Sequence, residues 1–474
     1  MSFPSVRATP LALLLPLLCG TLSLRAQADR YELGLRLRAF ERRLEATEDA
    51  ARRNAALDHM KRAVQAFFRF DTGSVAAAIA DADRALRAAD EDVATRVATS
   101  LALALEARLV PAGVGSVGFT LTAAYRADDE AELGAVPEGL TLVVEPVVAG
   151  AEGARLALTE VPAKGSLSLR GVPEGDHPLR WSIRRGDTVL VAREQAISVA
   201  ERLDARLSTY AAHSPYGGDD RKLETATLPF LLQTLEGMRK PRQEETVLAG
   251  VRMLEQAEAL MGTTPYYGPK RPGDFLLRVP VGGKTLPVRL SVPKQPSGER
   301  VPLVLALHGA GGSENLFFDG YGDGKVVRLA ESRGWYVVAP RNELGGVDGA
   351  GLIDALATRF PIDVERVLLV GHSMGAMQAM ANASRTPARF AAVAALGGGG
   401  GVRRSPELAK TPFFVGVGEF DFALAQARSL NRSLLAAGAE CTLREYPGVE
   451  HLAIVQIALD DVMTWFASQL TSQK

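Results

Sequence analysis

The sequence predicts an α/β chain whose C-terminal domain is built on a doubly wound, mostly parallel sheet, preceded by a helical region and a small β-sandwich. Three successive hydrophobic patterns predict this order. Apolar residues first recur with the helical period, then alternate with polar residues, and finally form short continuous runs separated by helical stretches. A chain of 474 residues is long enough for several such domains.

Composition narrows the classes of protein that need to be considered. Hydrophobic residues make up 47% and charged residues 23% of the chain, which is typical of a globular protein and excludes wholesale disorder. The net charge of -1 gives no general attraction to nucleic acid. Cys19 and Cys441 are the only cysteines and allow at most one bridge, so no disulfide framework holds the fold.

A signal peptide is predicted for residues 1–28. Arg7 precedes an apolar run over residues 11–24, and Ala26-Gln27-Ala28 supplies the small residues that a signal peptidase reads. The run is shorter than the roughly 20 residues that a membrane span needs. We therefore expect a cleaved export signal and a secreted or periplasmic protein, with an uncleaved membrane anchor as the alternative.

Residues 29–110 are predicted to be helical, because apolar residues recur there every three or four positions. The first stripe consists of Leu33, Leu37, Phe40 and Leu44. A later stripe, which predicts a third helix, consists of Val93, Val97, Leu101 and Leu105. This region is expected to serve in packing or docking.

Residues 113–208 are predicted to form an immunoglobulin-like β-sandwich. Short runs of alternating apolar and polar residues are separated there by turn signals such as Pro173-Glu174-Gly175. Trp181 falls on the apolar side of its strand, so we expect it in the core rather than on a glycan-binding surface.

A helical segment and linker are predicted for residues 209–263, and the α/β domain for residues 264–474. The last segment opens with a predicted hairpin and continues with five continuous apolar runs, which are typical of strands buried on both faces of a parallel sheet. These runs cover residues 301–307, 335–339, 367–370, 391–396 and 413–417.

The central chemical motif is Gly371-His372-Ser373-Met374-Gly375. A buried apolar strand leads into it and an Ala- and Met-rich helical stretch leads out, so Ser373 falls on a strand–turn–helix junction. Such a junction exposes the serine hydroxyl, and the flanking glycines avoid the clash that a Cβ would cause. Ser373 is therefore the predicted nucleophile.

A serine nucleophile needs a base to take its proton and an acid to orient that base. His451 lies in a loop before the C-terminal helix and is the predicted base, because an ordinary imidazole, with a pKa of about 6.5, serves well near neutrality. The acid is expected after the strand at 413–417, where Glu419 and Asp421 both qualify.

Backbone N–H groups are expected to stabilise the oxyanion of the tetrahedral intermediate. The glycine-rich stretch Leu307-His308-Gly309-Ala310-Gly311-Gly312 follows a predicted strand and lets the backbone approach a substrate oxygen. The N–H groups of Ala310 and Met374 are the predicted oxyanion hole. His308 is expected to hold this loop.

From about residue 275 to 470 the chain resembles an α/β-hydrolase. It is similar to the secreted esterase branch that includes dienelactone-hydrolase-like proteins, feruloyl esterases and polyhydroxyalkanoate depolymerases. The motifs LHGAGG, GHSMG, GEFD and GVEH occur in the family's order. The resemblance implies an α/β-hydrolase fold, and its spacing favours Asp421 over Glu419 as the acid. The helical and sandwich regions lie outside it.

The substrate-binding surface is harder to predict. Many α/β-hydrolases carry a helical cap between the sixth and seventh strands, but only residues 397–411 separate the corresponding runs here, so an open cleft is expected. The best lid candidate is the segment 313–325. Its aromatic residues Phe317, Phe318 and Tyr321 are predicted to line a substrate pocket, with a small core beneath the loop as the alternative.

Together these features predict an exported serine hydrolase that cleaves carboxylic esters, small or polymeric, through an acyl-enzyme intermediate. No cofactor, metal, nucleic acid or transmembrane segment is expected, and the N-terminal modules are available for an envelope or protein partner. Two alternatives stay open: a serine peptidase of the prolyl-oligopeptidase type, and a non-catalytic envelope binding protein with a vestigial hydrolase domain.

Overall fold

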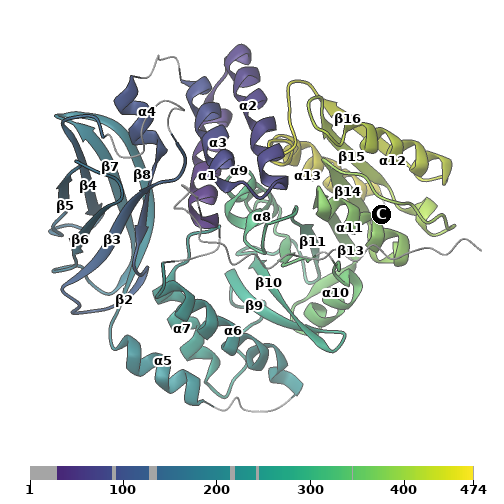
Figure 1. Ribbon diagram of the computed structural model, residues 1–474. Helices are drawn as coiled ribbons and strands as arrows, with labels where there is room; N and C mark the ends of the chain where they lie inside the picture. The colour runs from purple at the N-terminus through teal and green to yellow at the C-terminus, as the bar shows by residue number, and fades with distance from the viewer. Residues whose placement is uncertain are drawn as a thin grey trace, which may run out of the picture.

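The computed structural model describes residues 29–87, 92–126, 136–213, 219–241, 245–343 and 345–472. The predicted signal peptide, residues 1–28, and Cys19 lie outside the described residues. None of the described helices is both long and apolar enough to cross a membrane. A β-sandwich, a group of helices and a large sheet follow one another from left to right across the upper part of Figure 1.

Three helices open the described chain: α1 (Arg30–Ala46), α2 (Ala50–Phe68) and α3 (Thr72–Leu86). Asp29, Asp49 and Asp71 each precede one of these helices and accept hydrogen bonds from backbone N–H groups of its first turn. The apolar faces of the three helices share one buried core with α9 and α13 of the C-terminal domain. The N-terminal helices therefore cover part of that domain instead of forming a separate bundle.

The expected third helix does not extend to Leu105. Helix α4 (Val93–Ser100) ends before Leu101, and Leu101–Leu105 is strand β1. Leu101 and Leu105 are four positions apart, as on a helix, but Leu101, Leu103 and Leu105 also alternate with alanines, as on a strand. All three leucines are buried in the sandwich core, which favours the strand. The predicted helical region of residues 29–110 therefore extends too far.

The sandwich consists of two sheets around one core. One sheet has the strand order β1-β3-β6 and the other β2-β8-β7-β4-β5. Trp181 is fully buried between them, as predicted. The strands other than β1 are β2 (Leu109–Pro111), β3 (Ser116–Ala123), β4 (Leu140–Pro146), β5 (Ala154–Ala157), β6 (Ala163–Ser168), β7 (Gly175–Arg185) and β8 (Thr188–Ala200).

A helical segment connects the sandwich to the C-terminal domain. It contains α5 (Leu203–Ala212), the short 3-10 helix Asp219–Arg221, α6 (Lys222–Met238) and α7 (Gly250–Leu260). The first of these helices begins before residue 208, so the sandwich strands end earlier than predicted. Helices α6 and α7 pack on the same face of the C-terminal sheet as α10, α11 and α12.

The C-terminal domain is built on one eight-stranded sheet with the order β16-β15-β14-β13-β11-β12-β10-β9. The pairs from β16 to β12 are parallel, whereas β9, β10 and β12 pair antiparallel. The strands are β9 (Gly273–Val281), β10 (Lys284–Val292), β11 (Val301–Leu307), β12 (Tyr336–Pro340), β13 (Ile362–His372), β14 (Ala392–Leu396), β15 (Phe413–Gly418) and β16 (Cys441–Tyr446).

Helices cover both faces of this sheet. Leu303 and Leu305 of β11 point into one core and Val304 into the other, as the period of two in a strand requires. The helices are α8 (Leu316–Asp319), α9 (Tyr321–Glu331), α10 (Gly349–Ala357), α11 (Met374–Arg385), α12 (Leu424–Ala436) and α13 (Ile454–Ser472), with short 3-10 helices at Pro387–Arg389 and Leu408–Lys410. The predicted doubly wound α/β fold is confirmed.

Strand β16 is absent from the sequence prediction. It lies at the edge of the sheet, and most of its side chains are partly or fully exposed, so it lacks the continuous apolar run of the inner strands. Because the strands β11 to β16 run parallel, the loops after them meet at one end of the sheet, where ligands bind in open α/β folds.

Candidate active site

Ser373 occupies the turn between β13 and α11. Its backbone angles are φ 55° and ψ -115°, a strained conformation for a residue with a side chain. The strain is held by the buried strand on one side and the helix on the other. The predicted strand–turn–helix junction therefore exists, and it leaves Ser373 only partly buried.

The glycines beside Ser373 are required by space. A Cβ on Gly371 would lie 2.1 Å from the carbonyl oxygen of Gly375, and a Cβ on Gly375 would lie 2.0 Å from that of Leu307. No side chain fits at either distance. The turn therefore tolerates only glycine at these two positions, which explains the motif seen in the sequence.

The predicted base lies within hydrogen-bonding distance of both the predicted nucleophile and the predicted acid. His451 Nε2 is 2.9 Å from Ser373 Oγ, and His451 Nδ1 is 2.8 Å from Asp421 Oδ1. Asp421 and His451 are both buried. A buried carboxylate on one imidazole nitrogen and a serine hydroxyl on the other is the arrangement that activates a serine.

Glu419, the competing acid, has a different partner. Its Oε2 accepts a hydrogen bond of 3.0 Å from the N–H of Gly448, in the loop that carries His451. Glu450 accepts hydrogen bonds from the N–H groups of Leu452 and Ala453, and its burial raises its pKa to about 7. Neither carboxylate contacts the His451 ring through a hydrogen bond found in the described part of the chain, whereas Asp421 does.

The glycine-rich loop after β11 lies beside Ser373. A Cβ on Gly309 would lie 3.4 Å from Ser373 Cβ, which places the backbone of this loop next to the serine. Ala310 lies in this loop, and Met374 is the first residue of α11, at the N-terminal end of the helix. Ala310 therefore follows a residue that lies beside the serine, Met374 follows the serine itself, and their role as oxyanion donors stays a prediction.

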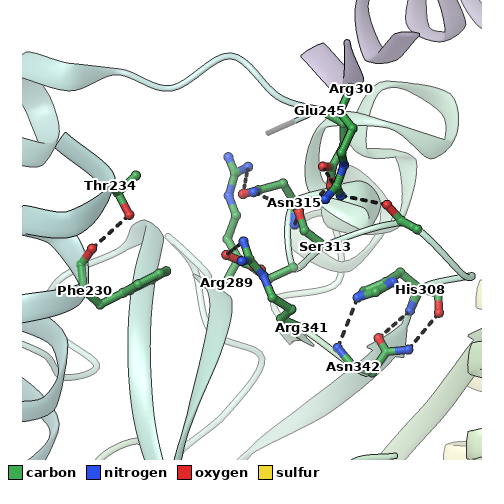
Figure 2. A network of polar contacts seen from close by, with 12 residues as sticks. Arg30, Phe230, Thr234, Glu245, Arg289, His308, Ser313, Asn315, Arg341 and Asn342 are labelled. Atoms are coloured by element: carbon green, nitrogen blue, oxygen red, sulfur yellow. Dashed lines mark hydrogen bonds and ion pairs between the residues drawn. The ribbon is translucent and has the colours of Figure 1, made fainter. Parts of the chain in front are cut away.

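His308 holds this loop through hydrogen bonds. Figure 2 shows it paired with Asn342, which follows β12. The Asn342 N–H donates to His308 Nε2 (3.1 Å). The side-chain amide of Asn342 accepts from the His308 N–H (3.1 Å) and donates to the His308 carbonyl (2.8 Å). His308 Nδ1 then donates to the Gly309 carbonyl (2.7 Å). Burial lowers the pKa of His308 to about 4, so the ring stays neutral.

The outer side of the loop is held from the N-terminal half of the chain. Arg30, at the start of α1, donates to the Gly311 carbonyl (2.7 Å) and to Glu245 (2.9 Å). Glu245 also accepts from the Ser313 hydroxyl, and Figure 2 shows the three side chains together. The loop is thus fixed by residues that lie outside the C-terminal domain.

A second chain of hydrogen bonds joins the oxyanion loop to the backbone of His451. The Gly309 N–H points to the Tyr321 hydroxyl (3.4 Å), which donates to His372 Nδ1 (2.6 Å). His372 Nε2 then donates to the His451 carbonyl (2.9 Å). Burial lowers the pKa of His372 well below its usual value, so it is neutral and bridges the two segments.

A known protein family matches part of the C-terminal domain. Residues 335–455 match the model of the dienelactone hydrolase family, a segment that contains Ser373, Asp421 and His451. The C-terminal domain has an α/β-hydrolase fold, and this segment of it is similar to the dienelactone hydrolase family. The match covers about a quarter of the chain, and no curated protein matches the sequence. The family match supports a carboxylic-ester hydrolase.

Solved structures with the same kind of fold are also similar to the chain. Fluorophosphonate-binding serine hydrolase F (FphF) of Staphylococcus aureus is 14% identical, with a TM-score of 0.36, covering 41% of this chain and 98% of that chain. An S-formylglutathione hydrolase of Agrobacterium tumefaciens is 21% identical (TM-score 0.34; 42% and 95%). A thermostable esterase is 15% identical (TM-score 0.38; 78% and 99%).

The predicted substrate pocket of the hydrolase domain is not found where the sequence placed it. Phe317, Phe318 and Tyr321 are buried in the core shared with α13 and the N-terminal helices. Tyr321 packs edge-on against Phe317 and bonds His372 with its hydroxyl. The correction has a simple cause, because α8 and α9 turn these rings toward the sheet, so the alternative of a core beneath the loop is the one observed.

Among the residues that the structure describes, no group of three or more His, Cys, Asp or Glu side chains is arranged to hold a metal ion.

Proposed function

We propose that this chain is an exported serine esterase that cleaves carboxylic esters through an acyl-enzyme intermediate. The observation that carries the proposal is the pair of hydrogen bonds from His451, one to Ser373 Oγ (2.9 Å) and one to Asp421 Oδ1 (2.8 Å). Export rests on the signal-like sequence of residues 1–28 alone.

The first half of the reaction transfers the acyl group to the enzyme. Ser373 Oγ attacks the ester carbonyl carbon while its proton moves to His451 Nε2, and Asp421 orients the imidazole and stabilises its positive charge. The negative oxygen of the tetrahedral intermediate accepts hydrogen bonds from the N–H groups of Ala310 and Met374. The bond to the alcohol oxygen then breaks, and that oxygen takes the proton from His451.

The second half releases the acid. Water attacks the acyl carbon while His451 takes one of its protons, and a second tetrahedral intermediate forms in the same oxyanion hole. The bond to Ser373 Oγ breaks, the serine recovers its proton from His451, and the carboxylic acid leaves. The net reaction consumes one water and yields one acid and one alcohol.

Substitution of the nucleophile tests the proposal. Ser373→Ala should reduce hydrolysis of p-nitrophenyl acetate at least roughly a thousandfold and abolish covalent labelling by a fluorophosphonate probe. Ser332→Ala, at an exposed serine at the end of α9, is the matched control and should keep both. Labelling of wild type without ester turnover, or turnover that survives Ser373→Ala, contradicts the proposal.

A further inference from the structure

Three exposed phenylalanines lie next to the catalytic groups. Phe67 and Phe68 are the last two residues of α2, and Phe422 follows Asp421 in the loop after β15. Their exposed fractions are 38%, 53% and 57%, which is high for such large apolar side chains. We call these three residues the aromatic wall.

Helix α2 lies along the loops that carry the acid and the base. Asn54, Lys61 and Phe68 are seven positions apart and therefore share one helix face. Lys61 Nζ lies 3.6 Å from the centre of the Phe420 ring, and the Phe68 ring lies 5.8 Å from that of Phe422. At the other end of α2, Asn54 Oδ1 lies 2.4 Å from where a Cβ on Gly448 would stand, in the His451 loop.

The aromatic wall contacts the catalytic machinery on two sides. The Phe422 ring lies 4.2 Å from the His451 ring, centre to centre. Phe67 Cζ lies 2.4 Å from where a Cβ on Gly311 would stand, so this ring rests on the oxyanion loop. Phe68 joins the two, with ring contacts of 5.6 Å to Phe67 and 5.8 Å to Phe422. An apolar surface thus extends from the oxyanion loop to the catalytic base.

Exposed apolar surface of this kind needs a reason, because single-domain surfaces rarely gather large aromatic side chains without a binding role. Phe67, Phe68 and Phe422 each leave more than a third of their surface exposed to solvent. They lie beside His451 and the oxyanion loop, and apolar rings with a few polar groups are the usual lining of a small-molecule site. Helices α1, α2 and α3 lie between the sandwich and the C-terminal sheet (Figure 1).

The position of His451 identifies the part of the substrate that meets the aromatic wall. The protonated imidazole must lie within hydrogen-bonding reach of the departing alcohol oxygen, so the alcohol leaves on the side of His451. Phe422 covers that side, and Phe68 extends it. We propose, resting on the esterase function above, that the aromatic wall binds the apolar alkyl or aryl alcohol part of the ester, with α2 acting as a cap supplied by the N-terminal region.

Two series of esters separate this proposal from its competitors. One series keeps the acetyl group and lengthens the alcohol from ethyl to butyl to hexyl, and the other keeps ethanol and lengthens the acyl group equally. In Phe68→Ala, kcat/KM for hexyl acetate relative to ethyl acetate should fall roughly tenfold, since apolar contact with several methylenes is lost. The acyl series should keep its wild-type ratios.

Two further variants control the experiment. Leu435→Ala removes an equally exposed apolar side chain from α12, away from the aromatic wall, and should change neither series. Phe68→Leu keeps an apolar side chain and should restore most of the alcohol preference. Circular dichroism should show the same folded state for all variants, because Phe68 is half-exposed.

The outcomes distinguish the two levels of the proposal. Wild-type turnover that is lost in Ser373→Ala supports the esterase function whatever the aromatic wall does. Given that turnover, an unchanged alcohol ratio in Phe68→Ala, or a loss along the acyl series instead, overturns the assignment of the aromatic wall. Absence of ester turnover in wild type overturns the esterase function, and the substrate assignment with it.

Discussion

Two groups of aromatic side chains flank the proposed catalytic residues, and the two groups differ in their exposure to solvent. Phe317, Phe318 and Tyr321 follow the oxyanion loop closely in the sequence but are buried in the core. The aromatic wall combines the end of α2 with the loop after β15, which are distant in the sequence, and its rings are exposed. Proximity to a catalytic motif along the chain is therefore a poor guide to which rings face a substrate.

The two groups should differ in what they contribute. Rings that are fully buried contribute mainly to the free energy of unfolding, because their removal leaves a cavity. Rings that stay exposed contribute little to folding and remain available to a ligand. Substitutions in each group can therefore test whether the buried rings stabilise the fold and the exposed rings bind the substrate.

Phe317→Ala should have the largest effect on stability. The side chain is fully buried and packs edge-on against Tyr321 at 4.8 Å between ring centres, so its loss should cost about 3–5 kcal/mol of unfolding free energy. Phe68→Ala, at a half-exposed ring, should cost less than about 1 kcal/mol. Urea unfolding followed by fluorescence measures both.

The same pair of variants also tests function. Folded Phe317→Ala protein should keep the wild-type preference among alcohols, which Phe68→Ala loses. Two outcomes would contradict this division between stability and substrate binding. One is an equal loss of unfolding free energy in the two variants, and the other is a changed ester preference in Phe317→Ala.

A pH-dependent effect of intermediate size is expected in the buried layer beside Tyr321. Glu41 of α1 is buried there, and burial raises its pKa to about 8, although the Gly322 N–H and Arg38 partly offset this. In the unfolded chain a glutamate ionises near pH 4.3. The folded state therefore binds more protons between those values, so this stability is complete below about pH 4 and is lost as the pH rises through about 8.

Glu41→Gln removes that loss, because an amide cannot ionise and its oxygen can still accept from the Gly322 N–H. The thermal midpoint of the variant relative to wild type should rise by a few degrees between pH 5 and pH 8. This rise corresponds to roughly 1–2 kcal/mol of unfolding free energy. Glu45→Gln, at a half-exposed position of the same helix, is the control and should show no such change. A difference between Glu41→Gln and wild type that is the same at both pH values would rule out a titrating Glu41.

Much of the hydrolase fold could be predicted, because its inner strands are buried on both faces and read as continuous apolar runs. The edge strand β16 was missed because its side chains are partly exposed. Leu101–Leu105 fits both the helical and the strand period, and only its burial in the sandwich decides between them.

In the active site, too, only the residues with a local sequence signal could be predicted. Ser373 and His451 could be predicted because a sharp turn and a loop before a helix leave local signals, whereas Glu419 and Asp421 differ only in whether they reach His451. The contacts of Phe68 with Phe422 and of Arg30 with Gly311 could not be predicted. They depend on how the N-terminal helices pack against the sheet, and the sequence carries no local signal of that packing.

The smallest expected effect concerns the hydroxyl of the buried ring Tyr321, which bonds His372 Nδ1 and lies 3.4 Å from the Gly309 N–H. Tyr321→Phe keeps the ring and its packing, so the unfolding free energy should fall by only about 1 kcal/mol. The oxyanion loop and the His451 backbone would lose their link, so kcat should fall several-fold while KM stays nearly constant. Tyr210→Phe, which removes a hydrogen-bonded hydroxyl on α5, should cost similar stability at unchanged kcat. If both variants lose stability and neither loses kcat, the buried aromatic group serves the fold alone, and only the exposed aromatic wall acts on the substrate.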